Sequence, residues 1–249
     1  MPSGAEAVAQ ADELERELRR LGRPERAASE RRYLKSDLEF IGVDAAGMRS
    51  VLRAYLQARD RLDHDALVEL VGALWDRPIH ERRALAVSLL ERQRRLLGAE
   101  DLPLLERLLR DALTWAYVDA LAVHVVGWLV ERHPELSATL DRWAADPDFW
   151  IRRSALLALL PPLRRGTGDF ERFARYADAM LEEREFFIRK AIGWVLREAS
   201  KSQPELVYAW VAPRTHRTSG VTIREAVKYL PEAQRAALLA AYTEKRPTA

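Results

Sequence analysis

An internal repeat of 35 to 37 residues is the feature of this sequence that most constrains its fold. The segment WIRRSALLALL from Trp150 aligns with FIRKAIGWVLR from Phe187, HERRALAVSLL from His80 and TIREAVKYL from Thr222. A fifth copy starts at Trp115, 35 residues before Trp150. This period is typical of helix-hairpin repeats of the HEAT type, in which helix pairs bury their apolar faces only by stacking on neighbouring pairs.

The matched segments are predicted to be the second helices of their pairs, because a shorter amphipathic stretch precedes each one. The first helices are predicted at residues 102–111, 134–145, 170–182 and 204–211. Gly127 and Gly193 are predicted to let two helices approach closely. The expected fold class is all-α, a HEAT-like helical-repeat solenoid (an α-α superhelix). We expect a single domain over residues 1–249, with repeats over about residues 25–243.

Composition supports helices throughout. The 249 residues include only 11 glycines, and 35 of the 40 basic residues are arginine. Without cysteine there is no disulfide framework, thiolate metal site or thiol nucleophile. The N-terminal stretch is rich in acids and lacks the apolar core of a signal peptide. The longest apolar stretch, near residues 120–130, is far shorter than the ~20 residues of a spanning helix. We expect an intracellular protein that binds no membrane.

One repeat departs from the template toward a charged side chain. The position after the basic pair is Ala84, Ser154, Ala191 or Ala226 in four repeats and Asp119 in the fifth. An ionised carboxylate at such a position is costly unless it is paired or functional. Asp119 is therefore either bonded to a neighbouring arginine or helix N-terminus, or is a functional carboxylate.

Two tryptophans are candidates for the same site. Trp115 lies four residues before Asp119 and shares its helix face, although packing alone would explain an aromatic residue at the head of a repeat. Trp194 is the largest residue at a position held elsewhere by smaller ones. We predict that Trp115 and Trp194 flank Asp119 with their ring faces turned toward it.

Basic residues share the phase of the second helices. Arg189, Lys190 and Arg197 lie on the helix of Trp194, and Arg153 lies one repeat earlier. The net charge of +2 does not by itself call for nucleic acid, but residues 161–230 carry 13 basic and nine acidic residues. Aromatic rings interleaved with arginines suit nucleic acid through stacking and phosphate contact. A solvated surface of mixed charge is the alternative.

Motifs for other chemistries are absent from the sequence. It contains no glycine-rich phosphate loop and no dinucleotide fingerprint. The five histidines have no metal-ligand spacing, and nothing singles out a Ser-His-Asp triad. We expect no metal and no cofactor.

At these residues the sequence resembles the alkylpurine DNA glycosylases of the AlkD type, a HEAT-like repeat family. The strongest match is EFFIRKAIGWVLREASKSQPELV, similar to the family's EFFI-x-KAIGWVLRE followed by a short linker and Pro. RRYLKSDLEFIGV from Arg31 resembles the family's Y-M-K-x-x-x-x-F-L-G, and WIRRSALL and TIREAVKYL match in order. The resemblance covers roughly Glu30 to Leu230.

This resemblance implies an enzyme that hydrolyses the N-glycosidic bond of cationic alkylated purines, such as 3-methyladenine and 7-methylguanine, in duplex DNA held on the concave face. It implies that Asp119 lies between Trp115 and Trp194 and that Tyr33 and Arg153 contact the DNA. Tyr117 is a departure from the family's pattern and is expected to add bulk beside the site.

The implied chemistry agrees with the residues. Alkylation at a ring nitrogen makes the purine a cationic leaving group, so the bond breaks toward an oxocarbenium-like sugar. A fixed carboxylate stabilises that charge and orients water, and indole faces favour cations by roughly 0.5–2 kcal/mol each. Such an enzyme would be a monomer in the cytoplasm, associated with the nucleoid if bacterial. The alternatives are a catalytically inactive relative that binds distorted or branched DNA, and a scaffold that binds protein.

Overall fold

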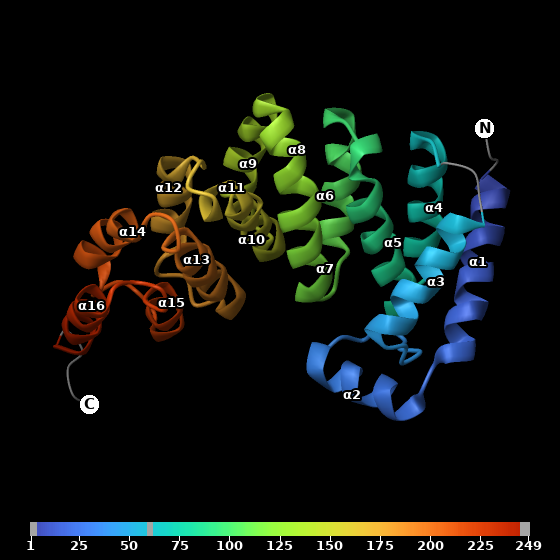
Figure 1. Ribbon diagram of the computed structural model, residues 1–249, viewed down its shortest axis with the longest axis horizontal. Helices are drawn as coiled ribbons and strands as arrows, with labels where there is room; N and C mark the ends of the chain where they lie inside the picture. Colours follow the sequence, from blue (N-terminus) through green and yellow to red (C-terminus); the bar gives the residue numbers. More distant parts are fainter. Residues whose placement is uncertain (1–3, 59–61, 245–249) are drawn as a thin grey trace. The chain divides into compact units, whose positions relative to one another are not determined.

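The computed structural model describes residues 4–58 and 62–244, and most of them are helical (Figure 1). Extended pairing within these residues is limited to one isolated bridge between Glu39 and Ile79. Contacts within the chain divide it into two compact units, Met1–Leu121 and Ala122–Ala249. The all-α helical-repeat fold is confirmed, whereas the single domain over residues 1–249 stays a prediction.

The first unit is built on helices α1, α4 and α5, which pack against one another. Leu67, Leu70 and Leu74 of α4 are fully buried, at the spacing that puts them on one face of a helix. In contrast, α2 buries none of its residues and stands apart from the other helices of its unit (Figure 1). The helices of this unit are α1 (Gly4–Leu21), α2 (Pro24–Leu34), α3 (Ala45–Gln57), α4 (His64–Asp76), α5 (His80–Gln93), α6 (Leu102–Arg110) and α7 (Trp115–Ala120).

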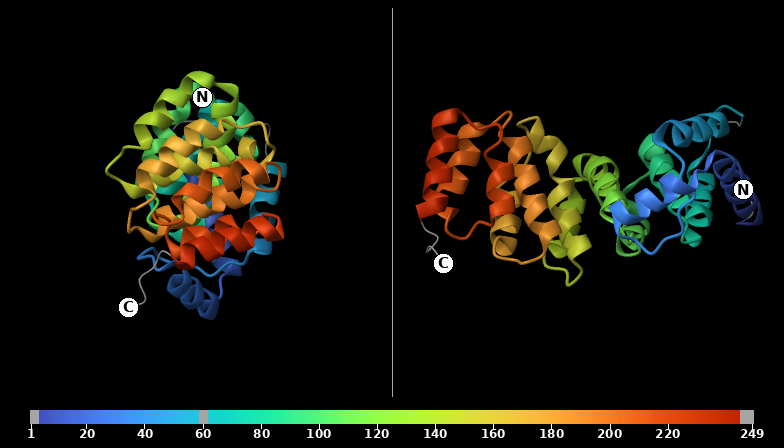
Figure 2. Two further views of the ribbon diagram at one scale, coloured as in Figure 1. Left: turned by 90° about the vertical axis from the view of Figure 1, so that its left-hand side faces the viewer. Right: turned by 90° about the horizontal axis from the view of Figure 1, so that it is seen from below.

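In the second unit, α10 packs against α13 and α13 against α15, so second helices of successive repeats lie side by side (Figure 2). A π-helical turn at Leu121–Val126 follows α7 and leads into the first helix of this unit. The helices are α8 (Gly127–Arg132), α9 (Ser137–Trp143), α10 (Phe149–Ala158), α11 (Leu160–Arg164), α12 (Phe170–Met180), α13 (Phe186–Ala199), α14 (Pro204–Val211), α15 (Gly220–Ala226) and α16 (Glu232–Glu244). None of the helices in the described parts of the chain combines the length and the apolar character that crossing a membrane requires.

The helix positions predicted from the repeat are confirmed. The five matched segments begin helices at His80, Trp115, Phe149, Phe186 and Gly220. The predicted first helices correspond to α6, α9, α12 and α14. A period read from the sequence therefore places both helices of these pairs.

Side-chain caps mark the starts of the second helices α7, α10, α13 and α15. Thr114 accepts a hydrogen bond from the Ala116 N–H (3.4 Å), so α7 begins at Trp115. Glu185 accepts from the Phe187 N–H (3.1 Å) at the start of α13. Such caps each contribute roughly 1 kcal/mol. Local chemistry thus fixes the starts of the two helices that carry the candidate tryptophans.

Both glycines named from the sequence lie at close helix contacts, as predicted. A Cβ on Gly127 would lie 2.7 Å from the Ala158 carbonyl oxygen. A Cβ on Gly193 would lie 2.7 Å from the Cβ of Glu225 and 3.0 Å from the Thr222 carbonyl oxygen. These approaches leave no room for a side chain, so α10 and α15 pack directly onto the backbone of α8 and α13.

Polar side chains join elements that lie about one repeat apart in the sequence. The intervals run from 34 to 36 residues within each unit, as in the hydrogen bonds of Trp75 with Asp111 (2.9 Å), Arg165 with Glu131 (2.5 Å), Tyr176 with Asp141 (2.6 Å) and Arg214 with Asp178 (2.6 Å). We call these pairs the inter-repeat bonds.

Candidate active site

The first turns of α7 present an indole and a carboxylate on one helix face. Trp115 and Asp119 are four residues apart and both are half-buried. The Tyr33 ring, at the end of α2, meets the Trp115 ring edge-on with centroids 5.7 Å apart. Tyr33 is 70% exposed. The structure thus brings together three of the predicted site residues, with one ring largely open to solvent.

Tyr117 lies on the opposite side of α7, and its predicted place beside the site is wrong. It is only 2% exposed, and its hydroxyl lies 2.6 Å from His80 Nδ1 and donates to the His80 carbonyl oxygen (3.0 Å). Side chains two residues apart on a helix point in nearly opposite directions, so Tyr117 faces away from Trp115 and Asp119. Tyr117 therefore adds bulk to the core and anchors α7 to the start of α5.

The contact between Tyr117 and His80 is uncharged. Burial raises the pKa of the Tyr117 hydroxyl, and burial also lowers the pKa of His80. The His80 ring stacks between Tyr117 and Phe40, with centroids 5.5 and 4.8 Å away. This neutral stack therefore positions α7 without adding a charge of its own.

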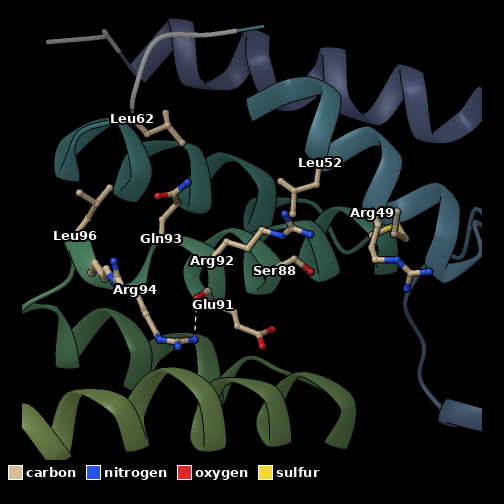
Figure 3. A pocket seen from close by; sticks show the side chains of 11 residues that line it. Arg49, Leu52, Leu62, Ser88, Glu91, Arg92, Gln93, Arg94 and Leu96 are labelled. Carbon is tan, nitrogen blue, oxygen red and sulfur yellow. Dashed lines mark hydrogen bonds between the residues drawn. The ribbon is translucent and has the colours of Figure 1, made fainter. Parts of the chain in front are cut away.

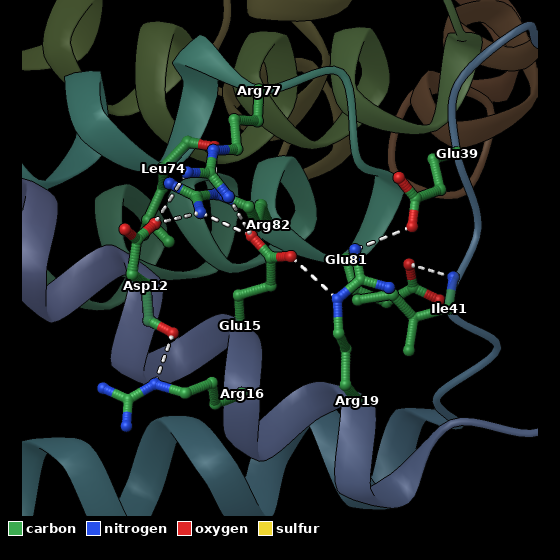
Figure 4. A network of polar contacts seen from close by, with 10 residues as sticks. All are labelled: Asp12, Glu15, Arg16, Arg19, Glu39, Ile41, Leu74, Arg77, Glu81 and Arg82. Atoms are coloured by element: carbon green, nitrogen blue, oxygen red, sulfur yellow. Dashed lines mark hydrogen bonds and ion pairs between the residues drawn. The ribbon is translucent and has the colours of Figure 1, made fainter.

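A buried carboxylate holds the loop between α2 and α3 (Figure 4). Glu81 is 1% exposed and accepts the N–H groups of Ile41 (2.9 Å), Gly42 (2.6 Å) and Val43 (3.2 Å). Gly42 has φ +88°, and a Cβ there would lie 2.2 Å from the Arg23 carbonyl oxygen. Since α2 buries no residue of its own, this loop is a main restraint on the helix that carries Tyr33.

An ion-pair network ties α1 to α5 beside that loop (Figure 4). Arg82 is 2% exposed and bonds to Asp12 (2.9 Å) and Glu15 (2.6 Å). The Arg82 hydrogen bond lowers the pKa of Asp12. Burial would raise the pKa of Glu15, but hydrogen bonds from Arg82 and Arg19 outweigh burial and lower it. The network therefore joins the buried Arg82 and Glu15 to Asp12, whose side chain is partly exposed, at the contact between α1 and α5.

In the second unit, Trp194 lies on α13 between two of the predicted cations. Lys190, Trp194 and Arg197 are spaced to share one helix face, and all three are half-buried. Both cations bond to Glu225 of α15, Lys190 at 2.7 Å. Within the described residues the Trp194 ring has no recorded aromatic or cation-π contact. Trp194 and Asp119 belong to different units, so it stays a prediction that Trp194 flanks Asp119.

Three cations converge on Glu225. Besides Lys190 and Arg197, Lys228 bonds to its carboxylate at 3.0 Å. Burial would raise the pKa of Glu225, but the hydrogen bonds from Lys190 and Lys228 and the charge of Arg197 outweigh it and lower the pKa to about 2. Sequence reasoning missed Glu225, although a signal was present. It holds the position that is basic in three other repeats.

The other predicted cations bond to backbone carbonyls. Arg153 is 2% exposed, donates to the Phe187 carbonyl oxygen, and lies over the Phe187 ring at 5.7 Å. Arg189 is half-buried and donates to the Glu183 carbonyl oxygen (2.6 Å). Because the Arg153 guanidinium is buried and packs α10 against α13, we do not expect it to contact a phosphate directly.

Side chains that could ligate a metal ion do not cluster in the described parts of the chain. No group of three or more His, Asp or Glu side chains able to hold a metal ion gathers among residues 4–58 and 62–244. The chemistry at α7 is a half-buried carboxylate beside an indole, with a solvent-facing phenol against that indole. Such a carboxylate can stabilise a positive charge that develops next to it.

Comparisons with known proteins identify the family. The chain matches the DNA alkylation repair enzyme family over residues 14–230. Among solved structures, it resembles a predicted DNA alkylation repair enzyme from Enterococcus faecalis, with a TM-score of 0.77 and 24% identity over 85% of this chain and 97% of that one. It also resembles smu.31 from Streptococcus mutans UA159, with a TM-score of 0.57 and 17% identity over 75% of this chain and 94% of that one.

At these identities the two structures establish likeness of fold alone. No curated protein matches the chain significantly. The family match spans most of the sequence, including the segments that carry Tyr33, Asp119 and Trp194. The chain belongs to the DNA alkylation repair enzyme family.

Proposed function

We propose that the protein is a monofunctional DNA glycosylase that hydrolyses the N-glycosidic bond of cationic alkylated purines, such as 3-methyladenine and 7-methylguanine, in duplex DNA. It would act in base excision repair, as a monomer in the cytoplasm and without a cofactor. The observation that carries the proposal is the arrangement on α7, where Asp119 shares a helix face with Trp115 and Tyr33 contacts that indole (ring centroids 5.7 Å apart).

In this mechanism Asp119 acts on the sugar. As the bond to the alkylated purine breaks, positive charge develops on the deoxyribose, and a nearby carboxylate stabilises it and orients the attacking water. The purine leaves as a neutral base because it carried the positive charge beforehand. Strong acid catalysis at the leaving group is therefore unnecessary.

The aromatic side chains act on the same charge. The Trp115 ring is half-buried, which leaves part of its surface for a cationic sugar or base. Tyr33 is open to solvent and is proposed to contact the nucleotide or its backbone. Trp194 is the corresponding proposal in the second unit, with Arg189, Lys190 and Arg197 as DNA contacts.

The central experiment measures release of free 7-methylguanine from methylated duplex DNA by the purified protein and by Asp119→Asn. The substitution keeps the shape and removes the charge. We expect release to fall by about 10²–10³, the usual loss when one preorganised electrostatic group is removed. Folding and DNA affinity should change far less than base release.

Asp76→Asn is the matched control, because Asp76 is an exposed carboxylate near the end of α4. It should release base at the wild-type rate. Wild-type release by Asp119→Asn would remove Asp119 from the mechanism. If the wild-type protein binds DNA and releases no base, a non-catalytic DNA-binding function replaces the glycosylase.

A further inference from the structure

A cavity rich in arginine lies in the first unit, between α3, the end of α5 and the 3₁₀ turn Arg94–Leu96 (Figure 3). Its volume is about 660 Å³. Four arginines line it, Arg49, Arg92, Arg94 and Arg95, with Glu91 as the one acidic residue of the lining. The lining thus carries three positive charges in excess.

The four arginines around this cavity differ from one another in their contacts. Arg94 donates to the Glu91 carbonyl oxygen at 3.3 Å. Arg49, Arg92 and Arg95 have no recorded hydrogen bond or ion pair within the described residues. In Figure 3, the Arg92 side chain extends toward Leu52, and Arg49 lies on the same helix as Leu52. These guanidinium groups are therefore available to an anion from outside the protein.

The rest of the lining is apolar or neutral. Met48, Leu52, Leu62 and Leu96 provide apolar surface, and Ser88 and Gln93 provide hydrogen-bonding groups. Small-molecule sites combine an apolar wall with a few polar groups in a volume of roughly 300–1,000 Å³. An inorganic anion would leave the apolar surface unused, so the cavity fits an organic anion with a flat or apolar body.

Charge and geometry favour phosphate over carboxylate. One carboxylate is satisfied by a single guanidinium, whereas a chain of phosphates presents many oxygens to several guanidiniums at once. A terminal phosphate carries about −1.5 to −2 at pH 7, and a second phosphate in the chain brings the total to about −3. That total matches the three guanidinium groups of Arg49, Arg92 and Arg95, for which the described residues provide no ion pair. We propose that this cavity binds a nucleoside phosphate, either free or at the end of a strand.

This site is separate from the candidate active site. Tyr117 of α7 contacts His80, the first residue of α5, whereas the α5 residues that line the cavity lie toward the other end of the same helix, at Ser88, Glu91, Arg92 and Gln93. A helix of 14 residues with a rise of 1.5 Å per residue spans about 20 Å. The inference therefore does not rest on the proposed glycosylase activity.

The test is titration calorimetry of the purified protein with ADP. Arg49→Ala/Arg92→Ala should weaken ADP binding by about tenfold or more for each arginine, the usual effect of losing a hydrogen bond to a charged group. Arg53→Ala is the matched control, since Arg53 is exposed on α3, four residues from Arg49, and outside the lining. It should leave ADP binding unchanged.

Glu91→Gln provides a result of opposite sign. It removes the acidic charge of the lining, so ADP should bind more tightly, which a merely structural role of these residues would not produce. Thermal melts should show that all variants keep the wild-type melting temperature, because none of these side chains has a recorded ion pair in the described residues.

Three further probes identify the ligand. A nucleoside phosphate is supported if ADP binds more tightly than inorganic pyrophosphate and more tightly than a glutamate-rich peptide. Tighter binding of a 5′-phosphorylated oligonucleotide, lost in Arg49→Ala/Arg92→Ala, assigns the strand end as its source. The proposal is overturned if ADP and the oligonucleotide both fail to bind at millimolar concentration, if the double variant binds them like wild type, or if pyrophosphate or the peptide binds as tightly as ADP.

Discussion

Replacing Glu225 by Gln tests how much its ion pairs stabilise the second unit. It also tests whether the cations that bond to Glu225 contact DNA. The Glu225 carboxylate is buried and bonds to Lys190, Arg197 and Lys228. Glu225→Gln keeps the size of the side chain and leaves these three cations close to one another without the negative charge that draws them together.

The magnitude follows from the pKa of Glu225. Its shift from 4.5 to about 2 corresponds to about 3 kcal/mol of interaction with the ionised form. The Lys190 and Lys228 side chains are 41% and 49% exposed, so solvent screens part of this interaction. We expect Glu225→Gln to lower the free energy of unfolding by about 1–3 kcal/mol at pH 7, and less at high salt.

The pH dependence has a definite sign. A carboxyl group whose pKa is lowered in the folded state stabilises the protein fully above its ordinary pKa of 4.5 and loses that contribution as the pH falls toward about 2. The stability difference between wild type and Glu225→Gln should therefore shrink over that interval. Urea unfolding at pH 7, 4 and 3 measures it, with Glu205→Gln, an exposed glutamate on α14, as the control.

Unchanged stability at pH 7, or a difference that does not shrink toward pH 3, would refute the ion-pair reasoning. The DNA prediction is separate and rests on the proposed function. With Glu225 neutral, the three cations are released, so DNA affinity should rise. The slope of log affinity against log salt should steepen by about 0.9 for each new phosphate contact. Weaker DNA binding by the folded variant would count against these cations as DNA contacts.

Three further substitutions test the packing around the site. Trp115→Ala should strongly reduce base release but lower the free energy of unfolding by less than the roughly 3–5 kcal/mol lost with a core tryptophan. Trp143 is fully buried, so Trp143→Ala should show that full loss of stability in the same urea assay. Gly193→Ala should destabilise by about 1–3 kcal/mol through overpacking against α15, whereas Gly72→Ala, with open space at its Cβ, should not destabilise. Tyr117→Phe should cost about 1–3 kcal/mol, because it removes the hydroxyl that bonds to the His80 ring and carbonyl oxygen, and base release measured on methylated DNA should stay at the wild-type level.

Periodicity predicted the helices well because it reflects packing that each repeat performs in the same way. The starts at His80 and Trp115 and the close contacts at Gly127 and Gly193 all follow from one template. The same template would have predicted the burial of Arg153. Arg83 holds the same position in another repeat and is also buried, whereas Lys190 at that position is half-buried.

Side-chain direction within a turn was harder to predict. Tyr117 and Asp119 are two residues apart, and the repeat alone does not tell which of them faces the core. The structure turns Tyr117 inward to His80 and leaves Asp119 half-buried on the face of Trp115. The hydrogen bond from the Ile41 N–H to Glu81 joins residues 40 positions apart. Hydrophobic periodicity predicts which residues of a helix are buried, but it does not predict such a polar contact with a loop.

The inter-repeat bonds have a consequence for the way the chain folds and unfolds. Each joins residues 34 to 36 positions apart, so a repeat can acquire most of its polar contacts as soon as its neighbour exists. Contacts this local favour fast folding that spreads along the chain from any formed pair. The terminal repeats, with a neighbour on one side only, should open first under mild denaturant. Hydrogen exchange should therefore show protection that declines from the middle of each unit toward the ends of the chain.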